Sequence, residues 1–386
     1  MEKIDKRIMK YNRNYGIDLL RITLMIFIVI GHLFAHTDIR RQVTFMSNKW
    51  WFTWALQAVT VSAVDCFVII TGYYMSSEIY NLWKGVKLWI KVFVYSVMIF
   101  IMLVLIGYAP LSVGGGGLDA FFPILRNEYW FFTMYLLLYL LIPFLNESIR
   151  NMSTQKMGAL IVIIVCFFYI EPLFSVVFYQ YDQSEGFSII AFVTLYVIGA
   201  YLRQKKGIPQ KYCIIILLGS SSAILMSKVV LQAITEYKNL HFGTGLLYHN
   251  NSVFVLINAI ALFYLFNGIN ISRLTFQKAI QWCTPSVFSV YLLHENPLVR
   301  KLIWNSQLLL YLEHCGFGWY IVTVLVIPII IFLTSLVIDK LLMKNILDII
   351  YHLSIMQKIQ RACERYNSVV SLSNRNISCQ GTFGDE

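Results

Sequence analysis

The sequence predicts an all-α fold, a polytopic transmembrane helical bundle of about ten membrane-spanning helices with both termini in the cytoplasm. Of its 386 residues, 58% are hydrophobic and only 13% are charged, whereas a soluble domain carries about 25% charged residues. Apolar runs follow one another from Ile17 to Leu342, and no polar stretch between them is long enough to build a core of its own. The basic residues also gather in alternate connecting segments, as expected of a chain that crosses a membrane repeatedly.

The apolar runs are mostly about 20 residues long, which is the length that a helix needs to cross the hydrocarbon layer. In chain order we expect spans near residues 15–36, 52–75, 87–108, 128–146, 157–178, 187–202, 211–233, 250–267, 284–304 and 319–342. The sixth is short for a span. Residues 1–342 therefore form a membrane domain. Residues 343–386 are expected to form a cytoplasmic interfacial helix, near 346–366, followed by a disordered tail.

The distribution of charge explains the net charge of +11. If the N-terminus is cytoplasmic, most Lys and Arg residues fall in cytoplasmic segments. The outer loops then hold only Arg40, Arg41, Lys49, Arg126 and Lys238. This bias follows the positive-inside rule. Membrane topology and contact with anionic lipid account for the excess of Lys and Arg over Asp and Glu, so no nucleic-acid partner is expected.

Several other classes of protein are disfavoured. The first apolar run is too long for a signal peptide and contains Arg21, His32 and His36, so it is expected to be a retained helix. The seven Cys residues are scattered singly, which predicts neither a disulfide framework nor a metal site, and no catalytic thiol. Two outer loops, 109–127 with its run of four glycines and 235–251 with His241 and His249, are either plain connectors or covers of an outward-facing site.

The first helix carries the strongest chemical signal. Ionisable residues inside a membrane span are costly and rare, yet this helix contains Asp18, Arg21, His32 and His36. At about 100° per residue, the eleven steps from Arg21 to His32 amount to about three turns plus 20°. All four side chains therefore share one sector, which we expect to face the interior of the bundle.

Depth separates the two ends of this stripe. Arg21 and His32 are about 16 Å apart along the helix, which places the guanidinium toward the cytosol and the imidazole toward the outside. This arrangement suits a reaction between a cytosolic donor and an outward-facing acceptor. A simpler alternative remains open: Asp18 and Arg21 neutralise each other, and His32 hydrogen-bonds a backbone carbonyl.

The Arg21–His32 spacing resembles the Arg-x10-His signature of acyltransferase family three, membrane-bound bacterial enzymes that acylate hydroxyl groups of saccharides. Three further segments are similar to the family in order: Ser62–Met75, with Thr71-Gly72 where the family has Ser-Gly; Glu128–Asn146; and Ser289–Pro297, with its Tyr-Leu-x-His core. The resemblance covers about 1–342.

The resemblance implies His32 and Arg21 as catalytic residues, with acetyl-coenzyme A, or another acyl-coenzyme A, as co-substrate and no bound cofactor or metal. It also implies donor binding at the Arg-x-x-Arg position of the family, where this chain has Lys84 and Lys87. Lysine cannot form the bidentate fork of arginine, so simple positive-inside charge is an equal explanation of these two residues.

Asp18, His36, Asp65, His294 and Glu295 are expected to support the site, and Glu128 and Trp130 to bind the acceptor. Asp65 lies at a depth similar to that of Arg21, so an ion pair between them would explain how both charged side chains lie within the membrane. His294 and Glu295 are central in the ninth span, where Glu295 could orient an imidazole and His294 could equally be a structural hydrogen-bonding residue. Glu128 and Trp130 could bind a saccharide, although aromatic residues are also ordinary at the membrane interface.

The sequence therefore predicts an O-acyltransferase of the bacterial inner (cytoplasmic) membrane. It would transfer acetyl to a hydroxyl of a cell-surface saccharide of the capsule, exopolysaccharide or O-antigen type, or of its lipid-linked precursor. The alternative is a proton-coupled transporter or flippase that uses the same charged stripe. The lack of matching halves with broken helices disfavours that alternative.

Overall fold

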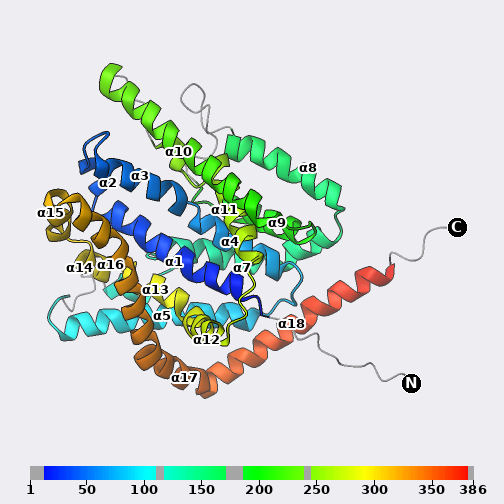
Figure 1. Ribbon diagram of the computed structural model, residues 1–386. Coiled ribbons are helices and arrows are strands. Elements are labelled where there is room, and N and C mark those ends of the chain that lie inside the picture. The colour runs from blue at the N-terminus through cyan, green and yellow to red at the C-terminus, as the bar shows by residue number, and fades with distance from the viewer. Residues whose placement is uncertain (1–12, 110–116, 171–185, 239–244, 381–386) are drawn as a thin grey trace.

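The computed structural model describes residues 13–109, 117–170, 186–238 and 245–380, and this part of the chain contains helices but no strand (Figure 1). In chain order the helices are α1 (Tyr15–His36), α2 (Ile39–Gln42), α3 (Asn48–Thr60), α4 (Ala63–Met75), α5 (Leu82–Leu105), α6 (Leu118–Phe121), α7 (Trp130–Arg150), α8 (Thr154–Val165), η2 (Cys166–Ile170), α9 (Ile189–Arg203), α10 (Gln210–Lys238), η4 (Leu246–Tyr248), α11 (Val253–Asn267), α12 (Leu274–Cys283), η5 (Thr284–Ser286), α13 (Val287–His294), α14 (Pro297–Ile303), α15 (Ser306–His314), α16 (Phe317–Ile338), η6 (Asp339–Met343), α17 (Lys344–His352) and α18 (Ser354–Gln380).

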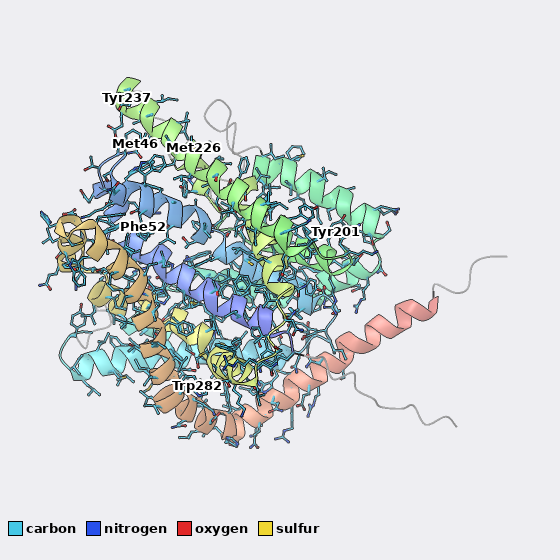
Figure 2. All side chains as sticks on the ribbon, in the orientation of Figure 1. Met46, Phe52, Tyr201, Met226, Tyr237 and Trp282 are labelled. Atoms are coloured by element: carbon cyan, nitrogen blue, oxygen red, sulfur yellow. The ribbon has the colours of Figure 1, made fainter. Side chains whose placement is uncertain are left out.

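Seven helical stretches within the described ranges are long and apolar enough to cross a membrane: Tyr15–His36, Asn48–Met75, Leu82–Leu105, Trp130–Arg150, Gln210–Tyr237, Leu246–Asn267 and Phe317–His352. They correspond to seven of the expected spans. The spans expected at 157–178 and 187–202 correspond to shorter apolar helices, Thr154–Ile170 and Ile189–Arg203. Residues 171–178 lie outside the described part of the chain. Exposed apolar side chains such as Met226 and Trp282 cover the outside of the bundle (Figure 2), as a lipid-facing surface requires.

The span expected at 284–304 is divided into η5, α13 and α14, because proline interrupts it. Pro297 has no amide hydrogen, and the residue before a proline is driven out of helical geometry. Asn296 accordingly leaves the helix, and its side chain accepts hydrogen bonds from the amides of Leu298 and Val299 to start α14. Glu295 and His294 therefore lie at the end of a short helix, inside the bundle.

Helix α1 runs through the middle of the bundle, in contact with α3, α4, α11, α12, α13 and α16 (Figure 1). The side chain of Asn14 accepts a hydrogen bond from the amide of Ile17 and starts the helix, as expected of an N-cap asparagine. Leu20 and Leu24 on one side of the helix and Leu33 on the opposite side are all fully buried. A central helix places its polar stripe where several other helices can contact it.

Helices α4 and α9 approach closely where each has a glycine. A side chain at Gly72 would come within 2.1 Å of the Tyr196 carbonyl oxygen, and one at Gly199 within 2.3 Å of that of Ile69. Small residues of this kind allow membrane helices to pack backbone against backbone. The neighbouring Thr71 lines the cavity described below.

The C-terminal segment is more helical than the sequence suggested. Helix α18 continues to Gln380, past the expected end of the interfacial helix at Tyr366. It runs crosswise to α1 (Figure 1) and meets the start of α5, where the Asn367 side chain accepts a hydrogen bond from the amide of Leu82. Residues 381–386 of the expected tail, and Gly114–Gly116 and His241 of the two outer loops, lie outside the described part of the chain.

Candidate active site

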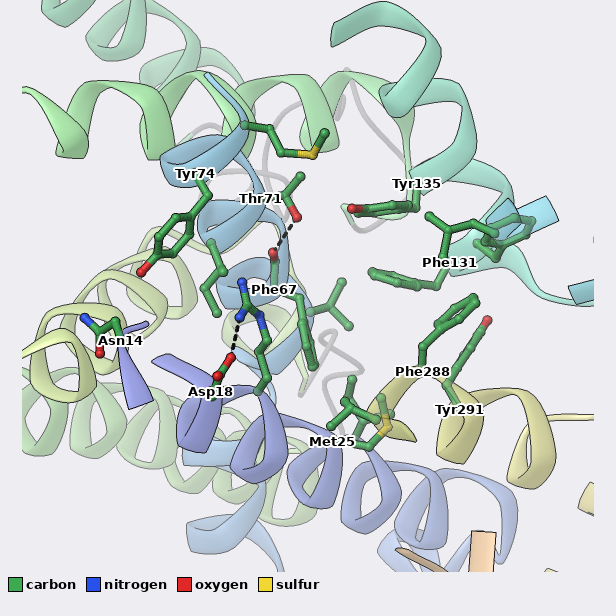
Figure 3. A pocket seen from close by; sticks show the side chains of 18 of the residues that line it. Asn14, Asp18, Met25, Phe67, Thr71, Tyr74, Phe131, Tyr135, Phe288 and Tyr291 are labelled. Atoms are coloured by element: carbon green, nitrogen blue, oxygen red, sulfur yellow. Dashed lines mark hydrogen bonds and ion pairs between the residues drawn. The ribbon is translucent and has the colours of Figure 1, made fainter. Parts of the chain in front are cut away.

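A cavity of about 830 Å³ lies along one side of α1, enclosed by α4, α7 and α13 (Figure 3). Both Arg21 and His32 line it, so the polar stripe of α1 faces a shared space inside the bundle. Its other lining residues include Arg13, Asn14, Asp18, Met25, Phe67, Thr71, Tyr74, Ser77, Glu78, Trp130, Phe131, Tyr135, Arg203, Phe288 and Tyr291.

One end of the cavity is basic. Asp18, which is buried, accepts from Arg21 at 2.8 Å and from Arg13 at 2.5 Å. The Arg21 guanidinium also lies 5.7 Å from the centre of the Tyr74 ring. Arg203, at the end of α9, donates to the carbonyl of Tyr73 at 3.0 Å. Three guanidinium groups and the carboxylates of Asp18 and Glu78 leave this end with a net positive charge, which is suited to an anionic ligand.

The middle of the cavity is aromatic. Phe67 comes from α4, Phe131 from α7, and Phe288 and Tyr291 from α13 (Figure 3). The Phe131 ring lies 5.8 Å from that of Tyr291, and Phe288 stacks on Tyr291 at 6.1 Å. With Met25 of α1 they form an apolar wall between the basic end and His32. Such a wall gives the middle of the cavity an apolar lining, which suits an uncharged part of a ligand.

At the far end of the cavity, His32 contacts His294, the last residue of α13, and Glu295, which follows it. Its Nδ1 lies 2.9 Å from Nε2 of His294 and 3.0 Å from Oε2 of Glu295. His294 and Glu295 are buried, whereas the His32 side chain keeps 20% exposure toward the cavity it lines. The fold thus brings together residues that are 262 positions apart in the sequence.

Hydrogen-bond chemistry fixes the tautomers of these two imidazoles. Nδ1 of His294 lies 2.6 Å from the Val290 carbonyl, which can only accept, so this nitrogen carries a proton. Nε2 of neutral His294 is then an acceptor, and Nδ1 of His32 must be the donor. The lone pair of neutral His32 is therefore on Nε2, the nitrogen that no described residue hydrogen-bonds.

Glu295 is the centre of this cluster. Its Oε2 also lies 3.1 Å from Nε2 of His36, and its Oε1 accepts from Arg300 of α14 at 3.0 Å. Burying a lone carboxylate would be costly, and the surrounding donors offset that cost. The arrangement keeps Glu295 ionised and aimed at His32. A carboxylate that orients an imidazole in this way is a recurring part of general-base sites.

The ligand atoms of His32, His294 and Glu295 lie within 4.8 Å of one another, and these residue types can also hold Zn²⁺. Each atom already has a hydrogen-bond partner in the cluster. The cluster can therefore be satisfied by shared protons, and a metal would have to displace the proton on Nδ1 of His32.

A second polar cluster anchors the helix that carries His294. The buried carboxylate of Asp339 accepts from Tyr95 of α5 and Ser286 at 2.5 Å each, and from Ser289 at 2.6 Å. Lys91 lies 3.5 Å from the same carboxylate. These bonds tie α13 to α5 and to the end of α16. They fix the position of α13, and with it that of His294 and Glu295.

The expected ion pair between Arg21 and Asp65 is not formed. Arg21 pairs with Asp18, one turn away on its own helix. Asp65 is buried, and its Oδ2 has no hydrogen-bond partner among the described residues. The prediction was wrong because it used depth alone, whereas side chains three apart on one helix are already neighbours.

Lys84 and Lys87 do not line the cavity. Lys84 is exposed and lies 3.5 Å from Glu78, a residue of the cavity wall. The arginines of the cavity are instead Arg13, Arg21 and Arg203. Of the two residues considered for saccharide binding, Trp130 lines the cavity, whereas Glu128 is partly buried in the segment just before it.

Five residues of this region were missed in the sequence: Arg13, Arg203, Arg300, Tyr291 and Asp339. Asp339 could have been found, because it is a carboxylate at the end of a long apolar run. Arg13 and Arg203 gave only a positive-inside signal, which many arginines share. Tyr291 and Arg300 gave no signal that separates them from ordinary interfacial and structural residues.

The chain matches the family model of acyltransferase family three, described as an acyltransferase domain, over residues 14–338. The matched region begins just before α1 and ends at the last residue of α16, so it contains every side chain of the cavity except Arg13. No curated protein and no solved structure matches the chain.

Proposed function

The chain belongs to acyltransferase family three and is a membrane acyltransferase, and from this premise we propose that it transfers acetyl from acetyl-coenzyme A to a hydroxyl group of a bacterial cell-surface saccharide or its lipid-linked precursor. One observation carries the proposal: His32 is held by Glu295 on the wall of a cavity whose other end is lined by arginines.

His32 acts as the general base. Its Nδ1 proton is committed to His294 and Glu295, so Nε2 takes the proton of the acceptor hydroxyl. An alcohol is a weak nucleophile at neutral pH, and a positioned base contributes about 10²–10⁴-fold. Glu295 stabilises the imidazolium that forms. The charge on His32 therefore never lacks a partner during the reaction.

The basic end is the donor site in this proposal. Coenzyme A is polyanionic, and Arg13, Arg21 and Arg203 provide planar guanidinium groups that bind phosphate. The apolar middle would take the uncharged pantetheine arm and the thioester. The donor then enters from the cytosol, as the orientation with both termini inside requires, and its thioester reaches the level of His32.

The acceptor would enter from the opposite face of the membrane, near Trp130. An aromatic ring at the cavity wall can stack on the apolar face of a sugar. The order of the three parts along the cavity, cation, apolar wall and base, supports transfer across the bilayer core.

The test is a comparison of surface polysaccharides. A strain that lacks the gene is complemented with wild-type protein or with His32→Ala, and the purified polymer is examined by proton NMR. We expect deletion to remove an acetyl signal and leave the polymer. His32→Ala should insert normally and restore less than about one hundredth of the wild-type rate.

Two outcomes would overturn this proposal. Wild-type acetyl content with His32→Ala would show that His32 is not the base. A loss of the polymer itself, with no change in its acetyl content per repeat, would favour a transporter or flippase. Immunoblotting of the membrane fraction confirms that each variant is present in equal amount.

A further inference from the structure

A second hollow, of about 720 Å³, lies beside the start of α1, where this helix contacts α11 and α12. Arg13 and Asn14 line both this hollow and the cavity of the candidate active site, so the two spaces adjoin at these residues. Figure 3 shows Asn14 at the edge of the cavity, on the side of Asp18 and Tyr74. The volume of the hollow lies within the range of small-molecule sites.

The hollow is lined mainly by carboxamide side chains. They belong to Asn14, Asn267, Asn270, Gln277 and Gln281. A carboxamide is uncharged and offers both hydrogen-bond donors and an acceptor. Among the described residues that line the hollow there is one arginine and no carboxylate. This lining suits an uncharged group that is rich in donors and acceptors and is attached to an anionic one.

Two of the five carboxamides are free to bind a ligand. The side chains of Asn14 and Asn267 are bonded to each other at 2.9 Å, and Gln277 donates to a backbone carbonyl at 2.7 Å. Asn270 and Gln281 are exposed, and their side chains make no hydrogen bond with the described part of the chain. The bonded carboxamides therefore fix the shape of the hollow, and the other two present their donors and acceptors to an entering molecule.

An aromatic ring is also part of the lining. Tyr15, the first residue of α1, is half-buried there, and the Arg13 guanidinium lies 5.8 Å from the centre of its ring. Nucleobases stack on such rings, and Asn and Gln form paired hydrogen bonds with the amino group and a ring nitrogen of adenine. An aromatic ring, free carboxamides and one arginine together suit a nucleotide.

We propose that this hollow binds the adenosine 3′-phosphate part of acetyl-coenzyme A, with the diphosphate at Arg13 and the pantetheine arm in the cavity. This inference rests on the proposed acyl transfer. In coenzyme A the diphosphate joins the nucleoside to the uncharged pantetheine arm. Arg13 lines both spaces, so its guanidinium lies where the diphosphate would pass from one to the other. The nucleoside is remote from the thioester, so its contacts contribute affinity and leave turnover unchanged.

The double variant Asn270→Ala/Gln281→Ala removes both free carboxamides, which are exposed and support no other residue. Its KM for acetyl-coenzyme A should rise about tenfold with kcat unchanged, since the lost hydrogen bonds act equally on the bound donor and on the transition state. S-acetyl-4′-phosphopantetheine keeps one phosphate and lacks the nucleoside. With this donor, the variant and the wild type should agree within about twofold.

Adenosine 3′,5′-bisphosphate provides a test of binding without the thioester. It should compete with acetyl-coenzyme A in the wild type and inhibit the double variant about tenfold less well. Asn345→Ala/Gln357→Ala is the matched control, because these carboxamides are also exposed but lie on α17 and α18, outside the lining of the hollow. Its KM for acetyl-coenzyme A and its inhibition should equal those of the wild type.

The assay uses purified full-length protein and polysaccharide from the deletion strain as acceptor, with release of free thiol as the readout. An unchanged KM for acetyl-coenzyme A in Asn270→Ala/Gln281→Ala would overturn the nucleoside site and leave acyl transfer standing. An equal rise in KM for both donors would also overturn it, because the loss would not depend on the nucleoside. No turnover of acetyl-coenzyme A by the wild type would instead contradict the proposed function itself.

Discussion

Glu295 has more polar partners than any other side chain at the far end of the cavity, and each of its partners constrains it differently. Oε2 faces His32 and His36, and Oε1 faces Arg300. Because both oxygens are engaged, the carboxylate cannot rotate without breaking a charge-assisted bond. Glu295 therefore acts together with Nε2 of His294 to hold the proton of His32 on Nδ1, which leaves Nε2 free to act as a base.

Glu295→Gln removes the negative charge at position 295 and nearly preserves the shape of the side chain, so it tests the charge alone. The amide keeps the size of the side chain, but its NH₂ group can face His32 and favour the tautomer with the proton on Nε2. We expect acetyl transfer to fall by about 10³–10⁴-fold, as for other sites where an amide replaces the orienting carboxylate. The measurement is the initial rate of thiol release with the purified variant.

The control is Arg300→Gln, which removes an outer partner of Glu295 and keeps the carboxylate itself. Its rate should fall far less than that of Glu295→Gln. Similar losses in both variants would mean that the ion pair with Arg300, rather than the tautomer of His32, is what matters. Stoichiometric metal in the purified protein would point to coordination by the same residues.

The sequence identified most of these residues and offered the Asp18–Arg21 pair, which the structure forms, but not the contact between His32 and His294. Asp18, Arg21, His32 and His36 could be placed together because helical geometry relates them. That His294 and Glu295 meet this stripe depends on how α13 packs on α1, and no local pattern encodes a contact between such distant segments. The ion pair expected between Arg21 and Asp65 is not formed, because depth along the membrane does not specify in which direction a side chain points around its helix.

At the level of helices, the close approach of α4 and α9 shapes the wall of the cavity. Gly72 faces α9, whereas Thr71, Phe67 and Tyr74 of the same helix line the cavity. The Thr71-Gly72 pair was recognised in the sequence only as part of a family resemblance. The structure gives its physical reason: a side chain at position 72 would overlap the backbone of Tyr196.

Gly72→Ala is therefore expected to destabilise the fold, and overpacking of this kind costs about 1–3 kcal/mol or more. Gly219→Ala is the matched control, because nothing lies within 4 Å of the added methyl group on α10. Alanine there should stabilise the helix by about 0.5–1 kcal/mol. Thermal unfolding in detergent, followed by fluorescence-detected gel filtration, checks both. Equal unfolding temperatures for the two variants would contradict the close contact.

The boundaries of long helices were predictable, and those of broken helices were not. The expected span at 15–36 coincides with α1 because its length, composition and Asn14 cap all agree. The span expected at 284–304 was drawn through Pro297, although proline marks a helix boundary. That break ends α13 at His294. Pro297 thus contributes to the position of His294 and Glu295 beside His32.

For the molecule as a whole, the orientation in the membrane decides which substrate reaches the cavity from which side. The basic end, with Arg13, Ser77 and Arg203, lies at the start of α1 and near the contact between α18 and α5. The opposite end of α1 meets α2, and α15 lies beside α2. The excess of basic residues in the segments assigned to the cytoplasm predicts that the basic end faces the cytosol.

Cysteine labelling tests this orientation together with donor binding. Ser77 is exposed at the basic end and lines the cavity, whereas Gln307 on α15 is exposed at the other end. A membrane-impermeant maleimide should label Ser77→Cys in inverted vesicles only, and Gln307→Cys in intact spheroplasts only, each compared with the parent protein. Acetyl-coenzyme A should slow the labelling of Ser77→Cys, because the donor would cover that end of the cavity, and leave Gln307→Cys unaffected. Labelling of Ser77→Cys from outside would reverse the topology. Labelling from the cytosol without protection by the donor would keep the topology and move the donor site away from the arginines.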